Sequence, residues 1–212
     1  RCFLNMARQS VRRSGLTMPV VTRRFVDHAW RRGCDFIILD LEDSVPQHLK
    51  AYARSLIKDA IPNVSKGGAE AFTRINHDYV LADLEAIVWP GLSKVAYPKT
   101  EHAEEVRLLD TIITRLERER GIRSGTIEIG TNIETAVGVA NVFEIAAASP
   151  RVREFGMAGA GYDLSRDLGV EMFDALLERM LELERDDLVH HLAEGERQFD
   201  SGDFVTLQEA VA

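Results

Sequence analysis

The sequence predicts an α/β fold built on a parallel sheet, and two observations support this. Strand-like and helix-like runs alternate along most of the 212 residues, a rhythm typical of parallel strands joined by helices. The run FIILDL at residues 36–41 is almost continuously apolar, as expected for a strand buried on both faces. The alternation itself fits either a doubly wound sheet or a closed (β/α)8 barrel.

Each predicted element is placed by its apolar pattern and by the turn residues that bound it. Gly33, Pro90 and Gly121 each follow a helix-like run and are typical of helix ends, whereas Pro46 suits the start of one. The predicted strands are residues 2–6, 35–41, 71–75, 94–97, 126–131 and 154–158. The predicted helices between them are residues 20–32, 46–60, 79–89, 101–120 and 136–148.

The chain after Gly169 departs from this alternation. Residues 171–194 predict one long acidic helix, which a short strand or turn and a final helical run follow. A closed barrel needs two more strand–helix units, roughly 60 residues, and fewer residues than that remain. The sequence therefore predicts an α/β core at residues 1–170 and a helical segment at residues 171–212. If the core is a barrel, its last strands are either missing or replaced by that segment.

Composition and charge exclude several classes of protein. The chain is 45% hydrophobic and 28% charged, which is ordinary for globular proteins and excludes disordered and low-complexity classes. The net charge of −8 does not suit a general nucleic-acid binder. No apolar run approaches the ~18 residues of a membrane-spanning helix. Residues 1–33 hold eight arginines and one acid, a basic region that suits either a small anionic ligand or a solvated face.

The two cysteines, Cys2 and Cys34, form neither a disulfide framework nor a zinc-binding spacing. We therefore expect a reduced, cytoplasmic protein. No secretory signal peptide is visible, although the arginine-rich start also fits the remnant of a transit peptide.

Polar segments follow the predicted strands at their carboxyl ends, where parallel α/β folds carry their chemistry. Loops at the opposite edge, such as residues 63–68, are bland by comparison. This asymmetry predicts an active site at the carboxyl edge. The polar segments are residues 40–44 (DLEDS), 73–76 (TRIN), 98–101 (PKTE), 132–135 (NIET) and 159–165 (GAGYDLS).

Two carboxylates in these segments, Glu134 and Asp163, come from neighbouring strands and can converge on a cation. Mg²⁺ takes one or two carboxylates and leaves positions for substrate oxygens. Each acid also fits a helix N-terminus, where it would offset the helix dipole. The turn that holds Gly161 and Tyr162 is a candidate substrate-binding segment, because its glycines let backbone N–H groups approach an anion. An ordinary turn explains the same glycines.

Arg74 ends a buried strand, where an arginine is costly unless it is paired. It suits a bidentate clamp on a ligand carboxylate or a salt bridge to Glu42 or Asp43, and the two roles are compatible. Lys99 fits a structural ion pair better than a Schiff-base lysine.

Five motifs together resemble one known family. They are residues 35–45 (DFIILDLEDSV) with Lys50, Ala53 and Arg54, residues 74–76 (RIN), residues 97–101 (YPKTE), residues 133–138 (IETAVG) and residues 155–169. In this order, over about residues 1–170, the chain is similar to the citrate lyase beta-subunit-like family of the HpcH/HpaI aldolase superfamily. That family's first strand ends in a Val-Pro-Gly-like turn. Here residues 5–7 read Asn-Met-Ala, and an arginine-rich insertion follows to about Pro19.

The resemblance implies a (β/α)8 TIM barrel that binds Mg²⁺ and cleaves or forms a carbon–carbon bond in coenzyme A thioesters such as citryl-, malyl- or citramalyl-CoA. It implies that Glu134 and Asp163 are the metal ligands and that Arg74 grips the carboxylate of the oxo or hydroxy acid. Glu42 and Asp43 match the acidic pair of the same pocket, and Arg1 matches an arginine that begins the first strand. Family members are commonly homotrimers or hexamers in which a C-terminal segment covers a neighbour's site.

The chemistry leaves the proton acceptor open among an acid of the Glu42–Asp43 pair, a metal-bound water and a residue of a partner subunit. Two other functions also fit the sequence. The first is a class II aldolase that releases pyruvate or oxaloacetate without coenzyme A. The second is a non-catalytic regulatory subunit derived from a barrel.

Overall fold

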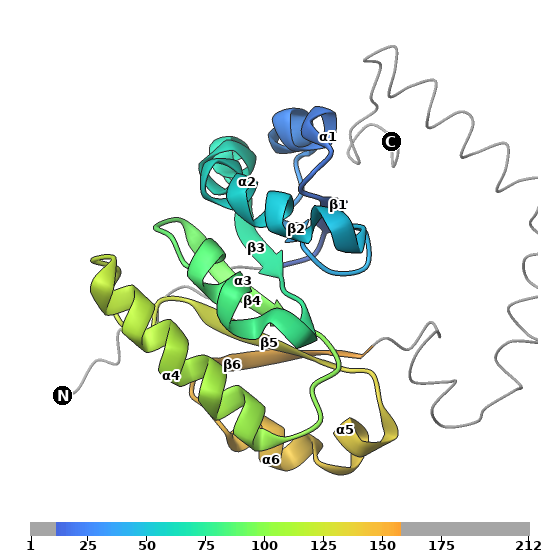
Figure 1. The fold of residues 1–212 in the computed structure, drawn as a ribbon, viewed down its shortest axis with the longest axis vertical. Helices are drawn as coiled ribbons and strands as arrows, with labels where there is room; N and C mark the ends of the chain where they lie inside the picture. Colours follow the sequence, from blue (N-terminus) through green and yellow to red (C-terminus); the bar gives the residue numbers. More distant parts are fainter. Residues whose placement is uncertain (1–11, 158–212) are drawn as a thin grey trace, which may run out of the picture.

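The computed structural model describes residues 12–157, which form an α/β fold on a six-stranded parallel sheet (Figure 1). The strands are β1 (Gly15–Pro19), β2 (Phe36–Asp40), β3 (Glu70–Arg74), β4 (Leu92–Tyr97), β5 (Glu128–Ile133) and β6 (Val152–Met157). The α-helices are α1 (Arg23–His28), α2 (Lys50–Val64), α3 (Val80–Ile87), α4 (Ala103–Glu119), α5 (Ala136–Ala140) and α6 (Val142–Ala147). Short 3-10 turns are η1 (Ala29–Arg32), η2 (Gln47–Leu49), η3 (Ser65–Gly67) and η4 (His77–Tyr79).

The strand order excludes a doubly wound sheet for the described part of the chain. The strands pair in sequence order from β1 to β6, and every neighbouring pair is parallel. A doubly wound sheet reverses its strand order at a switch point. Here the order never reverses, and the helices lie along one face of the sheet (Figure 1). This is the arrangement of a barrel wall, and closure of the barrel stays a prediction.

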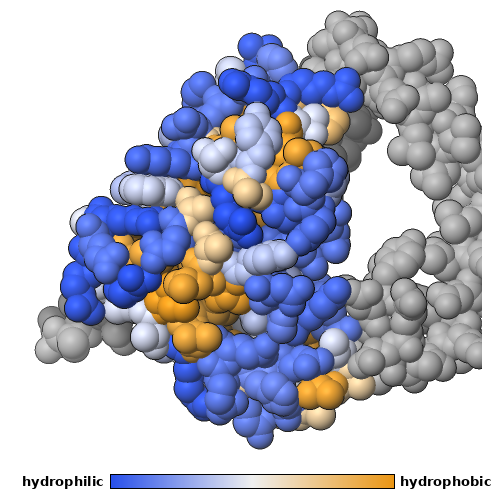
Figure 2. Space-filling model, viewed as in Figure 1, coloured by the Kyte–Doolittle hydropathy of each residue, from blue (hydrophilic) through white to orange (hydrophobic). Residues whose placement is uncertain are grey.

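The core lies between the sheet and the helices. The apolar residues Ala53, Ile57 and Ile61 recur at helical spacing on α2 and are buried, while Ile37 and Leu39 of β2 are buried in the same cluster. Full burial of one such aliphatic side chain contributes about 1.5–3 kcal/mol. The outer surface is mostly hydrophilic, with an apolar patch over α3 and α4 (Figure 2). Within residues 12–157, no helix combines the length and apolar character that a membrane crossing requires.

The strands predicted from the second onward are confirmed to within a few residues at their ends. Gly33 and Gly121 have φ values of +68° and +67°, which confirms the predicted helix ends. The helix predicted at 136–148 is divided in two. α5 ends at Ala140, and the side-chain amide of Asn141, which lies between the two helices, donates to the Glu101 carbonyl at 2.9 Å. The acidic helix predicted at 171–194 and the boundary at residue 170 lie outside the described residues.

The prediction for residues 15–19 is wrong. They are not part of an insertion, because they form β1 and pair along their length with β2. Pro19 and the neighbouring arginines resemble a loop, but β1 pairs on one side only within the described residues, and proline is tolerated on such an edge strand. The strand predicted at residues 2–6 lies outside the described residues.

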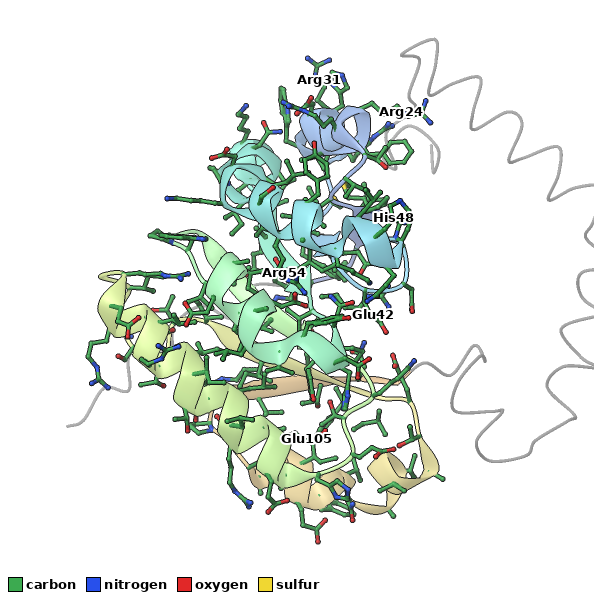
Figure 3. The ribbon with its side chains drawn as sticks, viewed as in Figure 1. Arg24, Arg31, Glu42, His48, Arg54 and Glu105 are labelled. Carbon is green, nitrogen blue, oxygen red and sulfur yellow. The ribbon has the colours of Figure 1, made fainter. Side chains whose placement is uncertain are left out.

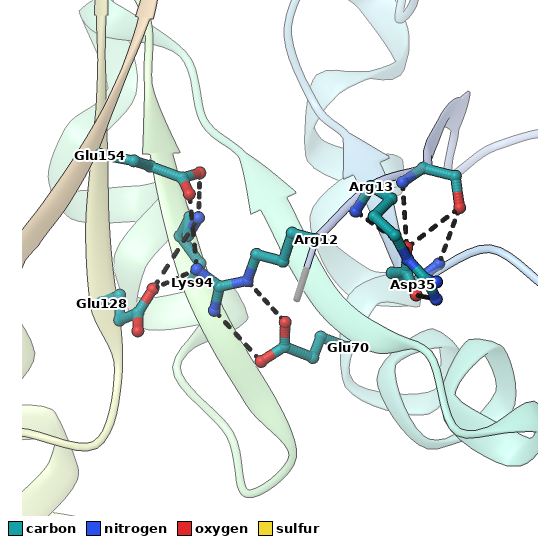
Figure 4. A network of polar contacts seen from close by, with 8 residues as sticks. Arg12, Arg13, Asp35, Glu70, Lys94, Glu128 and Glu154 are labelled. Atoms are coloured by element: carbon teal, nitrogen blue, oxygen red, sulfur yellow. Dashed lines mark hydrogen bonds and ion pairs between the residues drawn. The ribbon is translucent and has the colours of Figure 1, made fainter. Parts of the chain in front are cut away.

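An ion-pair network occupies the amino end of the sheet, opposite the polar segments (Figure 4). Arg12 contacts Glu70 at 2.6 Å and Glu128 at 2.8 Å. The buried Lys94 pairs with Glu154 and lies 4.3 Å from the centre of the Phe72 ring. Because these side chains come from position 12, which precedes β1, and from β3 to β6, the network ties the strands together, and Lys94 and Glu154 also line a cavity on the inner face of the sheet.

Arg151 ties α4 to the last two strands. It contacts Asp110 at 2.6 Å and the buried Glu117 at 2.6 Å, and it donates to the Ile127 carbonyl at 2.8 Å. We expect Arg151→Met to lower the free energy of unfolding by about 3–5 kcal/mol, because removing one partner of a buried ion pair leaves an uncompensated charge. Urea unfolding measures this.

The matched control is Arg107→Met, which removes the exposed ion pair between Arg107 and Glu104 on α4. It should change the free energy of unfolding by no more than about 1 kcal/mol. Equal stability losses in the two variants would contradict the structural importance assigned to Arg151.

Candidate active site

Asp40 and Arg74 form the centre of the carboxyl edge. They end neighbouring strands, β2 and β3, and lie opposite one another in the register. Arg74 Nε donates to Asp40 Oδ1 at 2.7 Å and Arg74 Nη2 donates to Oδ2 at 2.8 Å, a bidentate pair. Burial of Asp40 disfavours its charge, but hydrogen bonds from Arg74 and Ser44 outweigh this and hold the pKa of Asp40 below its usual value. Asp40 is therefore a buried anion that orients the guanidinium.

The third nitrogen of Arg74, Nη1, faces the acidic turn, which is formed by residues 41–45 directly after β2. Arg74 Nη1 lies 2.9 Å from Glu42 Oε2 and 3.2 Å from Asp43 Oδ2. The predicted salt bridges to Glu42 and Asp43 are thus confirmed, but the bidentate partner is Asp40. Asp40 takes the Nε hydrogen and one Nη2 hydrogen, so Nη1 and the second Nη2 hydrogen are left for other partners. The Asp43 side chain is 70% exposed and is the partner that a ligand can displace.

Glu42 lies in this turn with a shifted pKa. Its burial raises the pKa to about 7, although the charge of Arg74 opposes the shift and that of Asp43 adds to it. The charge of Lys99 also opposes the rise in the Glu42 pKa. A carboxyl group with a pKa near the working pH is suited to accept a proton and return it. Figure 3 shows Glu42 at this end of the sheet.

Glu134 follows β5 at the same edge and is 8% exposed. Its Oε2 accepts a hydrogen bond from the backbone N–H of Lys99 at 3.2 Å. Lys99 has a φ of +50°, a conformation that costs a non-glycine residue free energy and often marks functional sites. This loop conformation turns the Lys99 amide toward the Glu134 carboxylate.

The donor chemistry at this edge fits Mg²⁺, which prefers carboxylate oxygens. Among residues 12–157, no three histidine, cysteine or acidic side chains are grouped closely enough to hold a metal by themselves. The second predicted ligand, Asp163, lies outside the described residues, as do Arg1, Gly161 and Tyr162. Their roles stay predictions.

A cavity of about 300 Å³ opens on the inner face of the sheet beside Arg74. Phe36, Ile38 and Phe72 line its apolar part, and Asn132 lines it from β5. The volume is at the lower end of the range for small-molecule sites, which is about 300–1,000 Å³. It suits a small acid whose carboxylate contacts Arg74.

Sequence reasoning missed Asp40 as a site residue. The signal was present in the alternation Phe36, Ile38, Asp40, which places the acid on the same face of β2 as the two apolar side chains that line the cavity. A charged residue at the last inward position of a buried strand predicts a partner on the next strand, here Arg74.

Comparisons with known proteins agree with this architecture. The HpcH/HpaI aldolase/citrate lyase family matches residues 13–185. The citrate lyase subunit beta of Leuconostoc mesenteroides is 34% identical over 166 residues, 77% of this chain and 54% of the relative. The L-malyl-CoA/beta-methylmalyl-CoA lyase of Cereibacter sphaeroides is 35% identical over 145 residues, 65% of this chain and 44% of the relative. The crystal structure of RipC from Yersinia pestis has a TM-score of 0.54 at 27% identity, covering 74% of this chain and 61% of that one.

The chain spans about half the length of the curated relatives that it matches. The family match begins at residue 13, just before β1, so it includes β1 and leaves out residues 2–6. Because the match continues to residue 185 and covers most of the sequence, the chain belongs to the HpcH/HpaI aldolase/citrate lyase family.

Proposed function

We propose that this protein is a Mg²⁺-dependent carbon–carbon lyase that acts on a hydroxyacyl-CoA thioester such as citryl-, malyl- or citramalyl-CoA. The observation that carries the proposal is the grouping of Arg74, which lines the cavity, with the acids Asp40, Glu42 and Asp43. Similarity to a citrate lyase beta subunit and a malyl-CoA lyase supports the substrate class.

In this proposal Arg74 binds the substrate carboxylate through Nη1. The incoming carboxylate displaces Asp43, whose exposed side chain loses little on moving into water. Asp40 keeps Nε and Nη2, so the guanidinium is already oriented before the substrate arrives. Fixed orientation of the carboxylate places the reacting hydroxyl in one position and lowers the entropic part of the barrier.

Cleavage requires one proton to move from oxygen to carbon. Glu42 takes the proton of the substrate hydroxyl, the hydroxyl carbon becomes a carbonyl, and the electrons of the broken carbon–carbon bond pass to the carbon next to the thioester. Protonation of that carbon gives the acyl-CoA product, so atoms and charge balance. Mg²⁺, held by Glu134 and Asp163, would supply Lewis-acid polarisation of the substrate oxygens.

The proposed role of Glu42 predicts a pH dependence. Only the ionised carboxylate accepts a proton, so kcat/KM should fall tenfold per pH unit below a pKa of about 7. Glu42→Gln should remove this limb and lower kcat by about 10²–10⁴-fold. Asp43→Asn is the control and should retain the limb, moved to lower pH because the Asp43 charge helps to raise the Glu42 pKa. A full acidic limb in Glu42→Gln would assign the proton transfer to another group.

A direct assay tests the substrate class. Purified protein with Mg²⁺ is incubated with citryl-, malyl- and citramalyl-CoA, and the released acyl-CoA is quantified by mass spectrometry. The proposal predicts release that EDTA abolishes. Cleavage of the free hydroxy acids at equal rate would favour the class II aldolase, and turnover of neither set would favour the regulatory subunit.

The finer features of the proposal follow the family resemblance. We propose a closed (β/α)8 barrel in a cytoplasmic homotrimer or hexamer, with residues 171–212 packed on a neighbouring subunit. Light scattering coupled to size-exclusion chromatography determines the oligomeric state, and a monomer at assay concentrations would contradict the assembly.

A further inference from the structure

Lys50, the first residue of α2, binds the backbone of the acidic turn after β2. Lys50 Nζ donates to the Leu41 carbonyl at 2.7 Å and to the Glu42 carbonyl at 2.5 Å. These carbonyls flank the Cα atom of Glu42, so one ammonium group fixes both peptide planes that orient its side chain.

Asp40 accepts hydrogen bonds from the backbone N–H groups of the same turn. Its Oδ1 accepts from the Glu42 N–H at 3.0 Å, and its Oδ2 accepts from the Ser44 N–H at 3.0 Å. The Glu42 carbonyl also accepts from the Val45 N–H at 3.0 Å. The turn therefore has an anion that binds its N–H groups and a cation, Lys50, that binds its carbonyls.

The position of Lys50 is unfavourable for helix stability. A cation in the first turn of a helix opposes the helix dipole, and α2 has no acidic residue in that turn. Burial also lowers the pKa of Lys50, although the nearby charges of Asp40, Glu42 and Asp83 oppose this. Two short hydrogen bonds to the acidic turn are the compensating interactions.

We propose that Lys50 is a positioning residue that sets the orientation of Glu42 for proton transfer. This inference rests on the proposed function, since it assigns the proton transfer to Glu42. Lys50 acts through the backbone of the turn, because its Nζ is hydrogen-bonded to two main-chain carbonyls.

A second basic side chain of α2, Arg54, holds a different loop and so allows a comparison with Lys50. One turn further along, Arg54 Nε donates to the buried Asp83 at 2.6 Å, and Asp83 accepts from both the backbone and side-chain N–H groups of Asn76 at 2.7 Å. Through Asp83, Arg54 therefore holds the segment after β3. Lys50 and Arg54 thus lie one helical turn apart and hold different loops.

The experiment compares Lys50→Met, Lys50→Arg and Arg54→Met, with Lys58→Met as the matched control. Lys58 is exposed on the same helix and contacts Trp89. Amide hydrogen exchange is measured for peptides covering residues 41–49 and 75–80, and kcat and KM are measured with the preferred thioester. Thermal unfolding shows that each variant folds.

Lys50→Met should speed exchange in residues 41–49 and leave residues 75–80 unchanged, and Arg54→Met should do the reverse. In Lys50→Met, kcat should fall by about 10²-fold, as expected for a displaced catalytic group, with KM nearly unchanged. Lys50→Arg should restore most of kcat, and Lys58→Met should match the wild type in every measurement.

Unchanged exchange in residues 41–49 of Lys50→Met would overturn the inference, as would faster exchange there with a wild-type kcat. Hydrogen exchange needs no turnover, so it tests whether Lys50 holds the acidic turn independently of whether the protein is a lyase. A wild-type protein without lyase activity refutes the proposed function, whereas the exchange pattern separately shows whether Lys50 holds the turn.

Discussion

Arg74→Met should abolish lyase turnover and lower the free energy of unfolding by about 3–5 kcal/mol. The reason is the Asp40 carboxylate, which is buried and takes two hydrogen bonds from the Arg74 guanidinium. Methionine fills similar space but leaves that charge uncompensated. Urea unfolding and the thioester assay measure the two effects separately.

Arg74→Lys separates charge from geometry. An ammonium group keeps the positive charge but cannot bind Asp40 through two nitrogens while presenting a third to the substrate. We expect a smaller stability loss than in Arg74→Met, together with a raised KM and a lowered kcat. Wild-type kinetics in Arg74→Lys would remove Arg74 from the substrate site.

Glu134→Gln should lower Mg²⁺-dependent turnover by about 10²-fold or more, since substitution of residues that only support metal ligands already costs 10–100-fold. The amide keeps an oxygen that can accept from the Lys99 N–H, so the fold should remain intact. Titration with Mg²⁺ followed by calorimetry shows whether metal affinity falls in parallel.

Glu144→Gln is the control for that variant, because Glu144 is an exposed acid on α6. It should retain wild-type activity and Mg²⁺ affinity. Undiminished turnover in Glu134→Gln would contradict the metal assignment at the carboxyl edge.

Local patterns in the sequence predicted most of the sheet because its strands are short apolar runs bounded by polar carboxyl ends. The first strand was the exception. Its core-facing residue Met18 is buried, but Pro19 and the preceding arginines suggest a loop when read without their partner strand. Pairing between Gly15–Pro19 and Phe36–Asp40 is a tertiary property that no local pattern encodes.

The site shows the same limit. The sequence placed Arg74, Glu42 and Asp43 near one another, because parallel strands end at one edge. It could not determine which acid takes the two-nitrogen side of the guanidinium, since that depends on the register that sets Asp40 opposite Arg74. The hydrogen bonds from Lys50 to the turn carbonyls likewise depend on how α2 packs beside the end of β2.

The most direct test of the central claim is isothermal titration of oxaloacetate, pyruvate and acetyl-CoA into the purified protein, with Mg²⁺ and then with EDTA. We expect an oxo acid to bind with Mg²⁺ and not with EDTA, and to bind more weakly to Arg74→Lys. Acetyl-CoA should bind as well if the substrate is a thioester. Failure of both oxo acids to bind in the presence of Mg²⁺, or binding that EDTA leaves unchanged, would contradict a metal-dependent lyase site at the carboxyl edge of this sheet.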